Sequence, residues 1–138
     1  MSGNELPNVN FSTIEKMQAV ALKAIDGPVF MLNLNKYSTA AGFPDGSLYK
    51  EYMRSINKLV GEVEGKILWQ TTVNGQVVGA QDIDEVLGVW YPSHQAFLNI
   101  RTSPSSAKNM ELRDRAVQNA NLHWCDAYNS HAYQYKNN

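Results

Sequence analysis

Amides, a histidine and an indole are the side chains whose types and spacing could do chemistry in this sequence. Asn33 and Asn35 stand two residues apart in VFMLNLN, and Trp90 and His94 flank the tripeptide YPS further along the chain. Amide N–H groups can hold a carbonyl oxygen or stabilise a developing oxyanion. The same two amides could instead satisfy each other's hydrogen bonds across a subunit interface.

His94 is the candidate catalytic residue. It follows Ser93, a candidate N-cap, and so falls in the first turn of a predicted helix, where the positive helix end disfavours imidazolium. A neutral imidazole there could act as a general base. The alternative is a solvent-exposed polar residue at a helix start. Trp90 could stack on a planar ligand, although an aromatic residue on a central strand also suits a core or an interface.

No cofactor and no metal are expected from the motifs. The glycines of GEVEG and VNGQVVG have the wrong context for a phosphate-binding loop. Asp82, Asp84 and Glu85 lie on a loop that reads as solvated, which disfavours a mechanism based on paired carboxylates. One group of possible zinc ligands lacks any metal-binding spacing, and its members are His123, Cys125, Asp126 and His131.

Hydrophobic periodicity and helix and turn signals indicate the elements that must position these residues. Helices are predicted over about 13–25, from Ser47 to Gly65, over 93–100 and over 103–121. Strands are predicted over 29–35, 66–73, 86–91 and 122–127. Asn74 and Gly75 form a hairpin turn in this interpretation, followed by a short return over 76–79.

The order of these elements predicts the fold. Leaving aside the first helix, strand, helix, strand, strand, helix, strand is the βαββαβ order of a ferredoxin-like α+β domain. Its four-stranded antiparallel sheet carries helices on one face only. A bare apolar face is unfavourable in water, so we expect a homodimer in which a second copy covers it.

The expected site lies between the two facing sheets. Because side chains alternate along a strand, Asn33 and Asn35 share a face with Val29, Met31 and Tyr37, and we assign this face to the bare side. We place the first and third strands side by side and parallel, so that their C-terminal ends meet at one rim. The predicted small-molecule pocket then consists of Asn33, Asn35, Tyr37, Gln70, Thr72, Trp90 and His94. A slip of one residue in the second strand would replace Gln70 and Thr72 by Trp69 and Thr71.

Four stretches resemble the family known as domain of unknown function 1330: DGPVFMLNLNKY, YKEYMRSI, LGVWYPSHQAFLNI and RDRAV. The match runs from about Thr13 to Ala127, and YPS-x-x-AF directly after a strand is its most specific part. The resemblance implies a dimeric α/β barrel. That superfamily includes cofactor-free monooxygenases, muconolactone-type isomerases, haem-degrading enzymes and polyketide cyclases, and it implies no single reaction.

The resemblance adds two candidate ligand-binding residues. Tyr49 belongs to a Y-x-x-Y pair found in the family's helix. Arg115 matches the family's usual arginine and could bind a carboxylate, with a surface ion pair as the alternative. Haem degradation is disfavoured, because Met110 stands near the place of the helical histidine that this reaction needs.

Size and charge limit the function classes. The 138 residues fit one domain, which we place at 11–127 between a flexible arm over 1–10 and a tail over 128–138. A net charge of -1 without a block of like charge argues against nucleic acid as a partner. No apolar stretch approaches the roughly 20 residues of a membrane helix. With a single cysteine, Cys125, a cytoplasmic location is expected.

Two functions follow as hypotheses. The first is a cofactor-independent enzyme of cyclase, isomerase or monooxygenase type acting on an apolar or aromatic metabolite, with His94 as the base. The second is a non-catalytic ligand-binding or assembly dimer.

Overall fold

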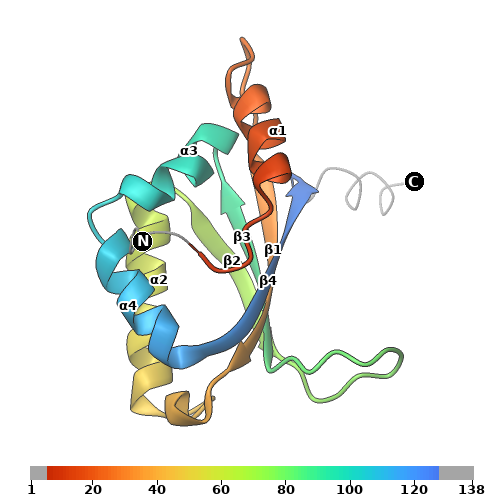
Figure 1. Ribbon diagram of the computed structural model, residues 1–138, viewed down its shortest axis with the longest axis vertical. Coiled ribbons are helices and arrows are strands. Elements are labelled where there is room, and N and C mark those ends of the chain that lie inside the picture. Colours follow the sequence, from red (N-terminus) through yellow and green to blue (C-terminus); the bar gives the residue numbers. More distant parts are fainter. Residues whose placement is uncertain (1–5, 128–138) are drawn as a thin grey trace.

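Four antiparallel strands in the order β2-β3-β1-β4 form one sheet, and helices α2 and α4 cover one of its faces (Figure 1). The computed structural model describes residues 6–127. The elements are α1 Phe11–Ala21, β1 Val29–Tyr37, η1 Thr39–Ala41, α2 Ser47–Glu62, β2 Lys66–Thr72, β3 Glu85–Tyr91, α3 His94–Leu98, η2 Asn99–Thr102, α4 Ser106–Ala116 and β4 Val117–Asp126. The ferredoxin-like α+β fold predicted from the element order is confirmed, including the helix before the first strand.

Two helix ends differ from the prediction. Helix α1 ends at Ala21, and Ile25, expected within it, is 87% exposed. Helix α4 ends at Ala116, and β4 begins at the next residue. Val117 and Ala120, interpreted as part of a helical stripe, instead pair with Tyr37 and Asn35 of β1. Pairing with a central strand therefore outweighs the weak helical periodicity of this segment.

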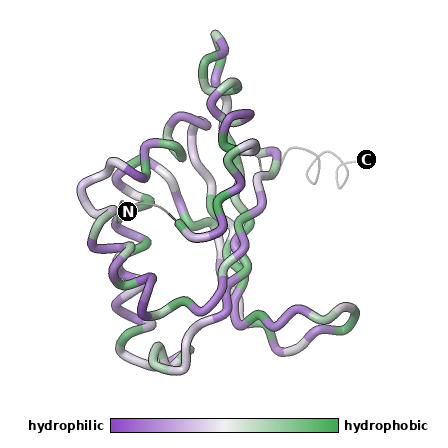
Figure 2. Tube along the Cα trace, in the orientation of Figure 1, coloured by the Kyte–Doolittle hydropathy of each residue, from purple (hydrophilic) through white to green (hydrophobic). Residues whose placement is uncertain are grey.

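The connection between β2 and β3 is longer than the predicted hairpin. The last ladder pair is Thr72 with Glu85, so residues 73–84 form a loop that we call the arm. The Asn-Gly pair is not a hairpin turn, and no strand forms over 76–79. The arm projects away from the helix layer, and its apolar tip contains Val77 and Val78, which are 100% and 86% exposed (Figures 1 and 2).

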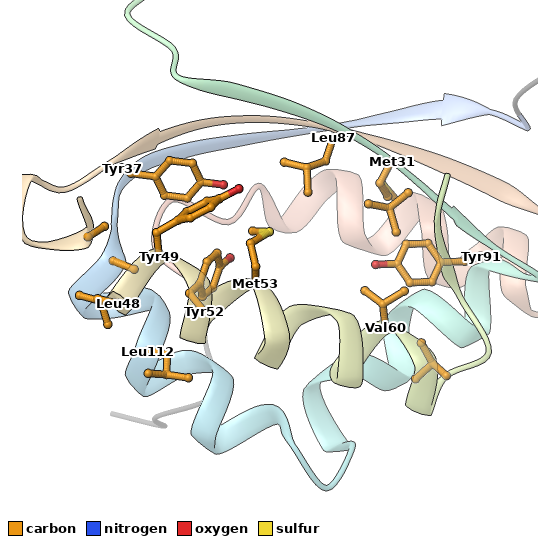
Figure 3. Packing of buried hydrophobic residues seen from close by; sticks show 14 of the residues in the cluster. Met31, Tyr37, Leu48, Tyr49, Tyr52, Met53, Val60, Leu87, Tyr91 and Leu112 are labelled. Atoms are coloured by element: carbon orange, nitrogen blue, oxygen red, sulfur yellow. The ribbon is translucent and has the colours of Figure 1, made fainter. Parts of the chain in front are cut away.

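The core lies between the sheet and α2. Buried residues of α2 recur at helical spacing, as its apolar stripe predicted, and they pack against alternate residues of β1 and β3 (Figure 3). The main partners are Tyr52, Met53 and Val60 on the helix and Met31, Leu87, Val89 and Tyr91 on the strands. Within residues 6–127, no helix has the length and apolar character needed to cross a membrane.

Candidate functional site

The face of β1 that carries the amides points toward the helices, contrary to the prediction. Val29, Met31, Asn35 and Tyr37 are 1%, 2%, 6% and 3% exposed, and the three apolar ones belong to the core under α2. Asn33 lines the space between the sheet and the helices. A pocket lined by Asn33 and Asn35 between two facing sheets is therefore wrong.

The bare side of the sheet carries the other half of each strand. On β1 this half comprises Phe30, Leu32 and Leu34, because side chains alternate. Trp90 pairs with Phe30 and does lie on the bare side, so it was rightly placed there but is separated from the amides by the sheet.

The predicted rim does not exist, because the two central strands run antiparallel. Asn35 pairs with Glu85 at one end of the sheet, and Val29 pairs with Tyr91 at the other. The C-terminal ends of β1 and β3 are therefore at opposite ends. Tyr37 lies near Glu85, far along the sheet from His94.

His94 is held by two neighbours. Its Nδ1 lies 2.9 Å from Oδ1 of Asp26, and its Nε2 accepts a hydrogen bond of 3.2 Å from the indole Nε1–H of Trp124. Because the indole nitrogen can only donate, Nε2 uses its lone pair in this contact and the proton belongs on Nδ1. The ring also lies outside the lining of the main cavity. His94 is thus poorly placed to act as a general base.

Asp26 completes this group by capping helix α3 from the loop between α1 and β1. Its oxygens accept the backbone N–H groups of His94 and Gln95 at 2.9 and 3.0 Å. Burial alone would raise the pKa of Asp26, but the hydrogen bonds from these N–H groups and from the His94 ring outweigh it and lower the pKa. Ser93 also caps α3, as predicted, by accepting from the backbone N–H of Ala96 at 3.0 Å.

Glu85 is the centre of a second polar cluster. It was expected on a solvated loop, but it is the first residue of β3 and is 3% exposed. The Tyr37 hydroxyl donates to Oε1 at 2.6 Å, the Tyr49 hydroxyl to Oε2 at 2.7 Å, and the Gln70 amide to Oε2 at 3.1 Å. The Asn35 amide donates to the Tyr37 oxygen at 3.1 Å. Figure 3 shows the tyrosine hydroxyls side by side, one from β1 and one from α2.

The cluster keeps its phenols protonated. Burial, and then the hydrogen bond to Glu85, raises the pKa of Tyr37 and of Tyr49 above the ordinary tyrosine value. Tyr37, Tyr49 and Gln70, all predicted as ligand-binding residues, are thus gathered around one carboxylate. Thr72 is at the adjacent edge, paired with Glu85, and is exposed.

A cavity of about 790 Å³ separates part of the sheet from the helices. Its walls come from α1, β1, α2, β3, the segment α3 to α4, and β4. Most of the lining is apolar and includes Ile14, Ile56, Leu87, Val89, Phe97 and Leu98. Leu6 and Val9, from the N-terminal segment 1–10 that we expected to be flexible, also line the cavity. Residues 1–5 of that segment lie outside the described residues.

Polar groups line the cavity at several points, including Gln18 of α1, Gln95 of α3, Arg101 of η2, and Ser106 and Asn109 of α4. Asn33 and Asn35 of β1 are among them, and so is Arg113 of α4. Arg115, which was the predicted carboxylate-binding arginine, is exposed and does not line the cavity. Two positions along a helix change the direction of a side chain by more than half a turn, so only one of the two arginines can face the sheet.

The sequence interpretation missed Glu85, Arg113 and the cavity. Glu85 directly precedes a run of alternating apolar residues, and its register with Thr72 and Asn35 puts it on the buried face. The acidic run QDIDE concealed this, because its other charged members do lie outside the sheet. Arg113 could have been found from its spacing of three to Met110 and of four to Asn109, both buried.

The fold is shared with solved structures, although no protein-family model and no curated protein sequence matches the chain. The RPA0582 protein of unknown function from Rhodopseudomonas palustris is 23% identical, with a TM-score of 0.71 and a coverage of 89% of this chain and 97% of its own. At3g17210 from Arabidopsis thaliana is 10% identical, with a TM-score of 0.58 and coverages of 74% and 97%.

A dabb family protein with a ferredoxin-like fold, mll5499 from Mesorhizobium loti, is 13% identical, with a TM-score of 0.52 and coverages of 75% and 99%. At these identities the likeness establishes the ferredoxin-like fold and carries no activity.

Proposed function

We propose that the protein binds a small, mostly apolar molecule in the cavity between the sheet and the helices. The observation that carries this proposal is a cavity of about 790 Å³ with mostly apolar walls and several amide and guanidinium groups. Ligand sites in proteins have volumes of about 300 to 1,000 Å³ and this same mixture of lining groups. A domain without a ligand gains more stability by closing such a space than by keeping it.

Binding is favoured over catalysis by the arrangement of the titratable groups. The charged residues in the described lining are Glu15, Arg101 and Arg113, and the assigned base His94 is not among them. General base catalysis needs an acceptor within reach of the substrate proton. A cofactor-independent enzyme is therefore the alternative, and the appearance of a chemical product on incubation with the bound molecule would favour it.

Filling the cavity tests the binding function. Ile56 is a half-buried lining residue on α2, and Ile56→Trp adds bulk inside the space. We expect the neutral fluorophore N-phenyl-1-naphthylamine to bind the wild type, with its emission enhanced, and to bind the variant roughly tenfold more weakly, since such a loss matches about 1.4 kcal/mol of contact.

Ile25→Trp is the matched control, because Ile25 is 87% exposed and outside the lining. Absence of binding to the wild type, or equal weakening by the two substitutions, would contradict the proposal. Thermal unfolding of each variant shows that both retain the fold.

We also propose that the bare side of the sheet is covered by a second copy of the chain. This surface, the open face, includes Leu32, Leu34, Trp69, Val86 and Trp90. The Trp69 ring lies over Gly88, where an added Cβ would meet it at 2.5 Å, and its centroid is 6.2 Å from that of Phe30. Gly88 thus leaves room for the Trp69 indole on a face that no helix of residues 6–127 covers.

Two features favour a copy of the chain as the occupant. Sheets pack face to face through such apolar surfaces, and a two-fold axis makes one surface complementary to itself. The arm leaves the sheet away from the helix layer and presents Val77 and Val78 bare at its tip, where a subunit on the open face would be within reach. The resemblance to the domain of unknown function 1330 family, which we extend here to membership as a proposal, implies the same dimer.

A cytoplasmic location is likewise proposed, on the single cysteine of the chain.

A further inference from the structure

Arg113 is a cation without a counter-ion at one end of the cavity. It is half-buried on α4, and within residues 6–127 its guanidinium makes no ion pair and no hydrogen bond. It also borders a smaller hollow of about 170 Å³ together with the first residues of β4, from Val117 to Ala120. A guanidinium that is partly removed from water gains from an anionic partner, and none is supplied by the described protein.

Other donors lie at the same end. Ala120 pairs with Asn35, so the start of β4 brings Arg113 to the part of the cavity where Asn35 and Asn33 face inward. Burial raises the pKa of the Tyr52 hydroxyl and the nearby charge of Arg113 opposes this shift, which puts Tyr52 in the same region. Donor groups therefore gather at this end of a mostly apolar space.

The wall that β3 forms beyond these donors is apolar. From Leu87 to Tyr91, β3 runs about 13 Å, at about 3.3 Å for each residue, and its inward residues are Leu87, Val89 and Tyr91. The Phe97 and Tyr91 rings meet edge to face, with centroids 5.2 Å apart. The cavity thus has donors at the β4 start and an apolar and aromatic wall along β3, and Gln95 of α3 and Arg101 of η2 also line it.

From this arrangement we propose that the ligand is an amphipathic anion, with a carboxylate or an equivalent acidic oxygen held by Arg113 and an apolar body along β3. The inference rests on the proposed binding function and adds the chemical class of the ligand to it. Arginine suits this role because its planar fork can give two hydrogen bonds to one carboxylate. The Asn35 amide already donates to Tyr37, and its carbonyl oxygen would accept from any hydroxyl on the ligand.

A matched pair of probes tests the head group. Decanoate and decan-1-ol share an alkyl chain and differ in charge, and each can be titrated by displacement of N-phenyl-1-naphthylamine. We expect wild-type protein to bind decanoate more tightly than decan-1-ol, and Arg113→Gln to weaken decanoate binding roughly tenfold while leaving decan-1-ol binding unchanged. Arg113→Lys keeps the charge and should lose less.

Arg115→Gln is the control, since it removes the same charge from an exposed position on the same helix. Equal binding of the two probes by the wild type, or equal weakening of decanoate binding by Arg115→Gln, would overturn the anionic class and leave the binding function standing. If the wild type binds neither probe, both the anionic ligand class and the proposed binding function are refuted. If Arg113→Gln does not fold, two other measurements test the proposal: decanoate binding to Arg113→Lys, and the salt dependence of decanoate binding to the wild type. Salt weakens a contact between charges but does not weaken the burial of an alkyl chain.

Discussion

At the scale of single residues, Glu85 explains why a strand with two amides can face the core. Its carboxylate receives three hydrogen bonds from β1, α2 and β2, and Asn35 is tied in through Tyr37. Buried polar groups stabilise a fold only when they are satisfied, and no described buried side-chain nitrogen or oxygen lacks a partner. The polar face of β1 is thus satisfied from within the subunit and needs no partner chain.

The phenols of this cluster predict an alkaline limit to stability. The pKa values of Tyr37 and Tyr49 are raised in the folded protein, so their contribution is complete below the ordinary tyrosine pKa of about 10 and is lost as the pH rises beyond it. We expect the free energy of unfolding to be level up to about pH 10 and then to fall by about 1.4 kcal/mol per pH unit for each phenol that must stay protonated.

Urea unfolding followed by circular dichroism between pH 7 and 11 measures this dependence. Tyr49→Phe should lower the stability at pH 7 by about 1 to 2 kcal/mol, because Glu85 loses a donor, and it should make the alkaline slope shallower. A slope that Tyr49→Phe leaves unchanged would show that other groups cause the alkaline loss.

At the scale of elements, His94 joins three parts of the chain that are distant in sequence. Asp26 comes from the connection between α1 and β1, His94 from the start of α3, and Trp124 from β4. The His94 and Trp124 rings meet edge to face, with centroids 5.5 Å apart. The end of β4 is thereby fixed to the cap of α3, which is a structural use of a residue that the sequence suggested for catalysis.

Removing this ring should cost stability. His94→Ala leaves the Trp124 indole and one contact of Asp26 without a partner, and we expect a loss of about 1 to 3 kcal/mol in the free energy of unfolding. Gln95→Ala is the control, because Gln95 is the next residue and its side chain makes an exposed hydrogen bond to Asn99. If His94→Ala lowers the free energy of unfolding no more than Gln95→Ala does, the link that His94 makes between β4 and the cap of α3 does not stabilise the fold.

At the scale of the whole molecule, the open face predicts the oligomeric state. Leu32 lies on a central strand of that face, and a lysine there can keep its stem on the sheet and its charge in water, so Leu32→Lys should fold. We expect the wild type at micromolar concentration to have twice the chain mass of 15.5 kDa, and Leu32→Lys to have the chain mass itself.

Light scattering coupled to size exclusion gives both masses. Glu51→Lys adds a lysine to the exposed side of α2 and should leave the dimer intact. A wild-type protein with the chain mass would refute the dimer and would not affect ligand binding, because the cavity is lined within one subunit.

Local patterns in the sequence determined the elements, their order and the sets of residues that share a strand face. Asn33 and Asn35 do share a face with Tyr37, and Gln70 joins the same cluster, because alternation is a property of each strand alone. The tertiary structure decided which face turns inward. That choice depends on Glu85 and the residues of α2, which are distant in sequence, and on central strands that run antiparallel. Both faces of β1 are apolar enough to be buried, so no local signal could distinguish them.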